Sequence, residues 1–203
     1  MTPAEVTAHI TEDIAEDAYA RQRKNPVRFS GRRLAEHMET LFFLCPKCGR
    51  VHTLQSRGDT VRCWKCGFSL RYLPTGFLAG EDLPFDNLRD WAAWQKGEIE
   101  RMCDEAGERP VFTDTDISCA EVEAAKGLKS IGKGDMRLYT DRLELPGLTL
   151  ELSEITGIAL RGPQDLYIGV KDHSYLLRSH YTRCMVKYLT ACSYLNPSAE
   201  YGV

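Results

Sequence analysis

Four cysteines in two matched pairs carry the clearest chemistry of this chain. Cys45 and Cys48 form one Cys-x-x-Cys pair, and Cys63 and Cys66 form the second. A gap of two residues lets both thiolates of a pair reach one ion from a tight turn, and two pairs supply the four sulfur ligands of a closed tetrahedral Zn²⁺ site. The spacing therefore predicts one structural zinc ion per chain.

The residues around the cysteines predict how the pairs are presented. Gly49 and Gly67 follow the two pairs, where a tight turn commonly needs the positive φ that glycine tolerates. Residues 50–62 between the pairs read as a hairpin, because strand-forming residues flank the turn sequence from Ser56 to Asp59. Two such turns joined by a hairpin are typical of a rubredoxin-like zinc ribbon.

Other roles for the cysteines fit the sequence less well. A thioredoxin-like redox motif places a single Cys-x-x-Cys at the start of a helix, whereas here a second pair follows and Gly49 disfavours a helix. Catalytic zinc keeps an open coordination position, which four cysteines fill, so we expect His52 on the hairpin surface rather than among the ligands. The remaining cysteines are expected to be buried free thiols: Cys103, Cys119, Cys184 and Cys192.

The composition is that of a soluble globular protein. The chain has 203 residues, of which 43% are hydrophobic and 27% charged, with a net charge of −3. It contains no apolar run of about 18 residues, and its first residues lack the basic and apolar regions of a signal peptide. We therefore expect a cytoplasmic protein.

Helical spacing marks the N-terminal part and the region after the ribbon. Residues 2–5 fit a capping box, and the following Val6, Ile10 and Ile14 predict a helix to about residue 24. A second helix is expected over residues 32–44. A third is expected after the ribbon, with Asp86 as its cap and a buried stripe formed by Leu88, Trp91, Ala92 and Ile99.

The C-terminal part changes to strand periodicity. Six or seven short strands are predicted between residues 111 and 177, followed by a helix from about Tyr181 to Leu195. Gly132-Lys133-Gly134 lacks the spacing of a phosphate-binding loop, so a turn or bulge is expected there. The predicted class is α+β, ending in a small PH-like or GRAM-like antiparallel β-barrel capped by a C-terminal helix. The expected segments are a helical lead-in (1–44), the zinc ribbon (45–72), a helical linker (73–109) and the β-domain (110–203).

Basic residues gather in the N-terminal part despite the negative net charge. No acidic residue lies between Asp17 and Glu36. These side chains form either a weak membrane-facing or nucleic-acid-facing surface or an ordinary solvated face. They are Arg21, Arg23, Lys24, Arg28, Arg32, Arg33, Lys47, Arg50, Arg57, Arg62, Lys65 and Arg71.

Several of these segments together resemble a known family. The runs Arg21-Gln22-Arg23-Lys24-Asn25-Pro26 and Arg33-Leu34-Ala35-Glu36, leading into the two cysteine pairs, resemble the region after the catalytic domain in bacterial 1-acyl-glycerol-3-phosphate acyltransferases, of the lysophospholipid acyltransferase family. Trp91-Ala92-Ala93-Trp94-Gln95 and Gly132-Lys133-Gly134-Asp135-Met136 are similar to those proteins too.

The resemblance implies an accessory region rather than an enzyme core. Such acyltransferases use a His-x-x-x-x-Asp motif, in which the aspartate orients a histidine that acts as general base. No histidine of this chain has that aspartate, because the residues five positions onward are Ile14, Phe42, Arg57, Arg178 and Met185. Acyltransferase activity would therefore require a longer enzyme, and the implied partner is its catalytic domain, in the same or a separate chain.

Three functions remain open from the sequence. The leading one is a non-catalytic zinc-binding accessory module of a phospholipid-synthesis acyltransferase, for structural support, docking or association with the inner face of the membrane. The second is a nucleic-acid-binding zinc ribbon, with Trp64, Phe68 and Tyr72 as stacking surfaces. The third is a protein-docking adaptor that uses the barrel edge or the tryptophans Trp91 and Trp94.

Overall fold

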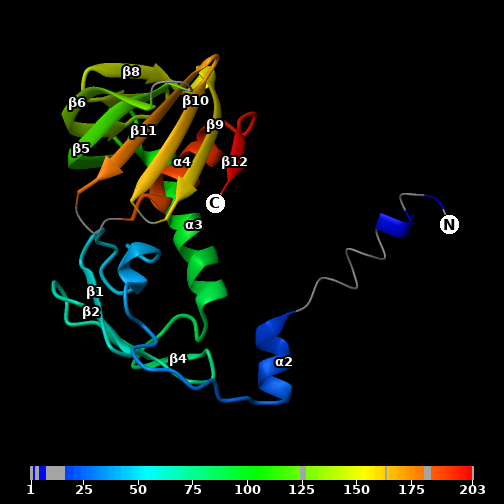
Figure 1. Cartoon of the computed structure of the whole chain (residues 1–203). Coiled ribbons are helices and arrows are strands. Elements are labelled where there is room, and N and C mark those ends of the chain that lie inside the picture. The colour runs from blue at the N-terminus through cyan, green and yellow to red at the C-terminus, as the bar shows by residue number, and fades with distance from the viewer. Residues whose placement is uncertain are drawn as a thin grey trace.

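The computed structural model of the chain describes residues 2, 5–7, 17–123, 127–162, 164–180 and 184–202. Figure 1 shows a ribbon part and a β-domain, with the long helix α3 (Leu88–Ala106) running between them. The ribbon part contains α2 (Ala18–Lys24), η1 (Met38–Thr40), β1 (Leu54–Arg57), β2 (Thr60–Cys63), β3 (Ser69–Tyr72) and β4 (Leu78–Gly80). The β-domain contains β5 (Phe112–Glu123), β6 (Gly127–Leu138), β7 (Arg142–Leu145), β8 (Leu148–Glu151), η2 (Leu152–Glu154), β9 (Ile155–Arg161), β10 (Asp165–Val170), β11 (His173–Ser179), α4 (Val186–Leu195) and β12 (Glu200–Gly202).

The first predicted helix is seen only in part. The capping box is present, since the Thr2 backbone N–H donates to Glu5 Oε2 at 2.6 Å and the Glu5 N–H donates to Thr2 Oγ1 at 3.3 Å. Helix α2 begins after Asp17, whose carboxylate accepts two backbone N–H bonds of the first turn. Ile10 and Ile14 of the predicted stripe lie outside the described residues.

The second predicted helix, over residues 32–44, is wrong. Only the 3₁₀ turn η1 forms there, because Arg33 and His37 adopt positive φ values of 58° and 63°, which interrupt a regular helix. Beyond η1 no further helix forms, and the apolar side chains enter two different cores. Phe42 packs in the ribbon core, whereas Phe43 and Leu44 pack in the β-domain core. The apolar run therefore connects two cores instead of forming one helical stripe.

The ribbon sheet has the strand order β1-β2-β3-β4 and is antiparallel throughout. The predicted hairpin is confirmed, with Arg57 opposite Thr60 and Leu54 opposite Cys63. Strands β3 and β4 extend the sheet beyond the second cysteine pair, which the sequence pattern did not indicate. One face of the sheet buries Val61 and Leu70 against the tryptophan of α3, and the other face is open to solvent.

Helix α3 supplies side chains to both cores. Its cap is Asn87, whose side chain accepts from the Asp90 N–H, and not the expected Asp86. The Trp91 ring is fully buried and stacks with the rings of Phe42 and Phe85, at centroid distances of 4.4 and 5.3 Å. Further along the helix, Ile99 and Cys103 enter the β-domain core, while Ala92 is exposed.

The β-domain is built on one eight-stranded sheet. Its order is β12-β9-β10-β11-β5-β6-β7-β8, with β12 parallel to β9 and every other pairing antiparallel. Strands β12 and β8 are its two edges, and no sheet of the described residues closes into a barrel. The closed PH-like or GRAM-like barrel is therefore not confirmed, whereas the mixed α+β class is. Helix α4 packs on the sheet (Figure 1), and it begins at Val186; Tyr181 lies outside the described residues.

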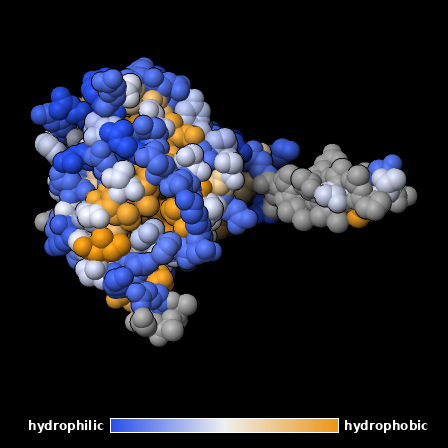
Figure 2. Space-filling view, turned by 90° about the horizontal axis from the view of Figure 1, so that it is seen from above, coloured by the Kyte–Doolittle hydropathy of each residue, from blue (hydrophilic) through white to orange (hydrophobic). Residues whose placement is uncertain are grey.

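The long strands β5 and β6 are bent by two register shifts. One lies between Asp114 and Ile117, and the other lies between Cys119 and Ala120, opposite the Gly132 region. Gly132, Lys133 and Gly134 themselves pair in regular register with Cys119, Ser118 and Ile117, so the turn or bulge expected at these residues is not found there, and the irregularities lie on either side of them. Seen from the β-domain end, apolar areas alternate with hydrophilic ones on the surface (Figure 2). Among the described helices, none combines the length and apolar character needed to cross a membrane.

The four cysteines outside the two pairs are buried free thiols, as predicted. Burial raises the pKa to about 11 for Cys103 and Cys119 and to about 12 for Cys184 and Cys192. At neutral pH these groups are protonated and behave as small apolar side chains.

Candidate metal centre

Two tight turns present the four cysteines. The Gly49 N–H donates to the Cys45 carbonyl at 2.9 Å, and the Gly67 N–H donates to the Cys63 carbonyl at 3.0 Å. Both glycines have positive φ, 65° and 76°, the conformation for which glycine was expected here. The turns face each other because β1 and β2 bring the ends of the hairpin together.

The four sulfurs form one compact cluster. The Sγ atoms of Cys45, Cys48, Cys63 and Cys66 all lie within 4.8 Å of one another. Two Sγ···Sγ distances are 3.6 Å, between Cys45 and Cys66, and 3.8 Å, between Cys48 and Cys63. Four thiolates around Zn²⁺ at about 2.3 Å have tetrahedral edges of about 3.8 Å. The cysteines are therefore positioned to bind one zinc ion.

The surroundings of the cluster affect its thiols unequally. Burial raises the pKa of Cys45. Burial also acts to raise the pKa of Cys63, but hydrogen bonding with Thr53 and with the backbone N–H groups of Cys66 and Lys65 outweighs it and lowers that pKa to about 6. Hydrogen bonds that favour a thiolate also favour metal ligation, because the ligand is the deprotonated form.

The first cysteine pair is fixed to the β-domain by the residues just before it. Gln95 of α3, itself buried, accepts the backbone N–H groups of Phe43 and Leu44 at 3.0 and 3.2 Å through Oε1 and donates to the Leu41 carbonyl at 3.0 Å. Phe43 and Leu44 belong to the β-domain core, and Cys45 follows Leu44 directly. The metal cluster therefore adjoins a segment anchored in the other part of the molecule.

A second connection is a buried polar cluster that the sequence analysis missed. The side chain of Lys187 in α4 is only 1% exposed, and its Nζ lies 2.5 Å from Oδ2 of Asp114 in β5. The Tyr188 hydroxyl donates to the same carboxylate at 2.9 Å. His52, from the ribbon, brings its Nε2 to 2.5 Å from Lys187 Nζ and 3.5 Å from Asp114 Oδ1.

This cluster changes the expected place of His52 and the charge state of Asp114. His52 has positive φ (55°) and its side chain, partly exposed, points to the β-domain rather than lying free on the hairpin. Burial acts to raise the pKa of Asp114, but the contacts with His52 and Lys187 prevail and hold that pKa well below its usual range. A signal was present in the sequence, since Lys187 stands at helical spacing from Ala191 in a largely apolar helix.

The twelve basic residues are distributed over several elements of the ribbon part. Arg23 pairs with Asp86 at 2.7 Å. Arg57, Arg62 and Arg71 project from the outer face of the ribbon sheet, and Lys47 and Lys65 lie in the cysteine turns. The remaining members lie on α2 or in irregular segments: Arg21, Lys24, Arg28, Arg32, Arg33 and Arg50.

The aromatic residues expected to stack on bases are mostly unavailable. Phe68 is buried in the ribbon core, and Tyr72 is partly buried against it. Trp64 alone is open, with 63% of its surface exposed. Trp91 and Trp94, expected as core or docking residues, are both packed against the cores of the molecule.

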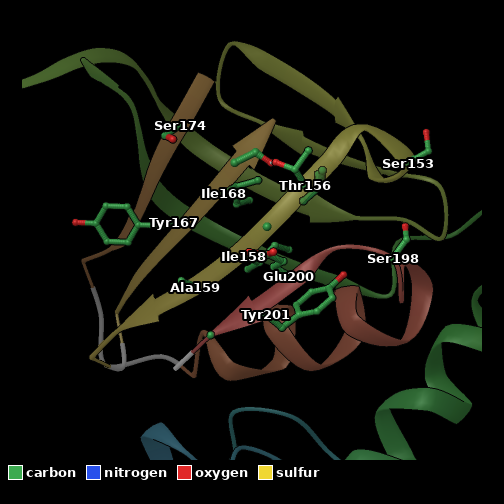
Figure 3. A pocket seen from close by; sticks show the side chains of 14 residues that line it. Ser153, Thr156, Ile158, Ala159, Tyr167, Ile168, Ser174, Ser198, Glu200 and Tyr201 are labelled. Atoms are coloured by element: carbon green, nitrogen blue, oxygen red, sulfur yellow. The ribbon is translucent and has the colours of Figure 1, made fainter. Parts of the chain in front are cut away.

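A wide hollow of about 810 Å³ lies on the outer side of β9, β10 and β12 (Figure 3). Its lining offers hydroxyl groups, among them Thr156 and Ser174, and one carboxylate, Glu200. The Tyr201 hydroxyl is directed to the backbone carbonyls of Cys192 and Asn196, so it fastens β12 to the end of α4. The described lining contains no histidine, cysteine or lysine.

Comparison with known proteins identifies the ribbon and no more. Residues 38–72 match the zinc-ribbon family model described as "DNA directed RNA polymerase, 7 kDa subunit". No curated protein matches the chain, and neither result connects it with acyltransferases. The match covers η1, both cysteine pairs and strands β1 to β3. The chain thus contains a zinc ribbon whose four cysteines are placed for one structural Zn²⁺.

Proposed function

We propose that this chain is a non-catalytic accessory module in which zinc fixes the ribbon to the β-domain. The observation that carries the proposal is the closed set of four sulfurs next to two residues, Phe43 and Leu44, that enter the β-domain core. A catalytic zinc has three protein ligands and an open position. Four thiolates leave no such position, so the ion serves the fold.

The coupling between metal and fold supports this role. In small zinc sites the free energy of metal binding is also folding free energy, because the site does not preexist in the unfolded chain. Here Cys45 is covalently next to Leu44 of the β-domain core, and His52 of the same ribbon joins the Asp114–Lys187 pair. Zinc bound to the ribbon therefore stabilises the β-domain interface as well.

The setting proposed for the module is phospholipid synthesis. It rests on the resemblance to the region after the catalytic domain of 1-acyl-glycerol-3-phosphate acyltransferases, which makes that domain the proposed partner and the inner face of the membrane the proposed location. The run of antiparallel strands from β5 to β11, followed by α4, supports a PH-like or GRAM-like assignment for the β-domain. As a fold-level analogy, this assignment does not supply a ligand.

Nucleic-acid binding is the second candidate, favoured by the RNA polymerase subunit named in the matched description. Against it, the packing of Phe68 and Tyr72 leaves little aromatic surface for stacking. For the protein-docking alternative, Trp91 is not accessible to a partner because it is fully buried. The edge strands β8 and β12 of the β-domain sheet are the remaining candidate contacts.

Hydrogen exchange of the β-domain, with and without zinc, tests the proposed role. Chelation is expected to increase amide exchange in β5 and α4 as well as in the ribbon, because residues 41–44 and His52 lose their support. Cys103→Ala, which removes a cysteine outside the cluster without burying a polar group, serves as the matched control and should show the same change on chelation as the parent chain. Unchanged exchange in the β-domain after zinc removal, or acyl transfer to lysophosphatidate by the chain alone, would overturn the proposal.

A further inference from the structure

We propose that the end of the ribbon farthest from the β-domain binds an anionic phospholipid surface. The inference rests on the accessory role proposed above and names the partner of one face. The surface, called here the ribbon-end patch, combines unpaired arginines with exposed apolar side chains. Its members are Val27, Arg28, Phe29, Arg32, Arg33, Arg57 and Arg71.

Strand register places two of the arginines on one face. Arg57 of β1 lies opposite Thr60 of β2, and Thr60 lies opposite Arg71 of β3. Directly opposed residues share a face of the sheet. The alternate positions Val61 and Leu70 are buried on the inner face, so this row points to solvent.

Hydrogen bonds fasten the segment before η1 to the same end of the ribbon. The Phe29 N–H donates to the Pro74 carbonyl at 2.8 Å, the Leu34 N–H donates to Asp59 Oδ1 at 2.7 Å, and the Ala35 N–H donates to the Gly58 carbonyl at 2.9 Å. Gly58 and Asp59 form the turn of the β1–β2 hairpin. Figure 1 shows this segment running along the ribbon at the end opposite the β-domain.

The arginines of the patch differ from most basic residues of the β-domain. There, Lys133, Lys171 and Arg178 each pair with an acid at 2.7 Å. Within the described parts of the chain, no ion pair joins any of the five arginines of the patch. The nearby acids have other partners: Glu36 accepts the Gly58 N–H, and Asp59 accepts the Leu34 N–H.

The apolar members decide between a lipid surface and a nucleic acid. Phe29 is 60% exposed and Val27 is 54% exposed, and Arg28 stands between them along the chain. Surfaces that combine exposed apolar side chains with unpaired basic ones bind anionic membrane interfaces by burying the apolar groups among the headgroups. Single-stranded nucleic acid binds where bases stack on aromatic side chains, and here Phe68 is buried in the ribbon core while Tyr72 is partly buried against it.

Sedimentation of the zinc-loaded full chain with lipid vesicles tests the patch. The probes are phosphatidylcholine vesicles with and without phosphatidylglycerol. The parent chain should prefer the anionic vesicles by at least on the order of a hundredfold, because each uncompensated arginine near such a surface contributes about fivefold and the patch holds five of them. Arg28→Gln/Arg57→Gln/Arg71→Gln should lower that preference by on the order of a hundredfold, and Phe29→Ser should reduce binding further.

A matched triple variant separates the patch from net charge. Lys96→Gln/Lys129→Gln/Lys171→Gln removes the same charge from exposed lysines that are paired elsewhere, and it should bind vesicles as the parent does. An equal loss of vesicle binding in both triple variants would overturn the proposal. A parent chain that shows no preference for anionic vesicles, but binds nucleic acid in a way that only the arginine triple variant loses, would overturn it too. A folded, zinc-loaded chain that ignores anionic vesicles contradicts the patch alone, whereas a chain without zinc contradicts the accessory role.

Discussion

Replacing Lys187 with methionine leaves the buried carboxylate of Asp114 without its ammonium partner. Methionine fits the space of the lysine stem, so the change removes a charge with little change in packing. Removing one member of a buried ion pair costs about 3–5 kcal/mol. Tyr188 and His52 still contact the carboxylate, so we expect the lower end, about 3 kcal/mol, and a fall in Tm of about 6–12 °C for a chain of this size.

Urea unfolding of the zinc-saturated chain, followed by tryptophan fluorescence, measures this cost. Lys171→Met is the matched control, because Lys171 pairs with Glu154 at 2.7 Å but both side chains are exposed. An exposed pair contributes less than about 1 kcal/mol, so the control should unfold nearly as the parent does. The double variant Asp114→Asn/Lys187→Met should recover most of the loss, since neither residue then leaves an isolated buried charge.

The reasoning would be refuted by a loss below about 1 kcal/mol in Lys187→Met, which is the range of an exposed pair. It would also be refuted if the double variant lost the sum of the two single effects. Additive losses indicate that Asp114 and Lys187 do not depend on each other, contrary to the 2.5 Å contact between them.

Three further outcomes follow from the structure. Because the pKa of Asp114 is lowered in the fold, its ionised carboxylate stabilises the folded chain at pH values above the ordinary carboxyl pKa of about 4. This contribution is lost as the pH falls below that value. The difference in free energy of unfolding between the parent and Asp114→Asn should therefore be largest near neutral pH and shrink below about pH 4. Gly67→Ala should lower the free energy of unfolding by about 1–2 kcal/mol through its φ of 76° alone, because an added Cβ meets nothing within 4 Å. Gly97→Ala, inside α3, should instead stabilise the fold. Equal effects of the two substitutions in chemical denaturation would contradict this. Thiol alkylation followed by mass spectrometry should leave four buried cysteines of the folded chain unmodified: Cys103, Cys119, Cys184 and Cys192. Removal of zinc by a chelator should make the other four cysteines reactive. Rapid labelling of Cys192 in the zinc-loaded chain would count against the described packing.

Features set by short sequence patterns were predictable from the sequence. The spacing of Cys45, Cys48, Cys63 and Cys66 indicated the metal cluster because the turn geometry is local, and strand periodicity located most strands of the β-domain. The helix predicted for residues 32–44 was wrong because the apolar residues of this segment pack in two cores, with Phe42 in one and Phe43 in the other. A helical pattern cannot be distinguished from that arrangement over so few residues.

Long-range contacts explain what else the sequence analysis missed. Asp114, Lys187 and His52 come from β5, α4 and the ribbon, and only the tertiary fold brings them together. The openness of the β-domain sheet depends on how β12 and β8 end, which no local pattern specifies. The basic residues were visible in the sequence, but their division between paired and unpaired groups required the positions of Asp86 and the other acids.

The most direct test of the structural zinc site is metal quantification of the purified chain and its variants. The structure predicts one zinc ion per chain, lost in Cys45→Ser and in Cys66→Ser and retained in Cys103→Ser, because only the first two remove a member of the four-sulfur cluster. A parent chain without zinc, or full zinc retention in either ligand variant, would contradict the metal centre on which the proposed function depends.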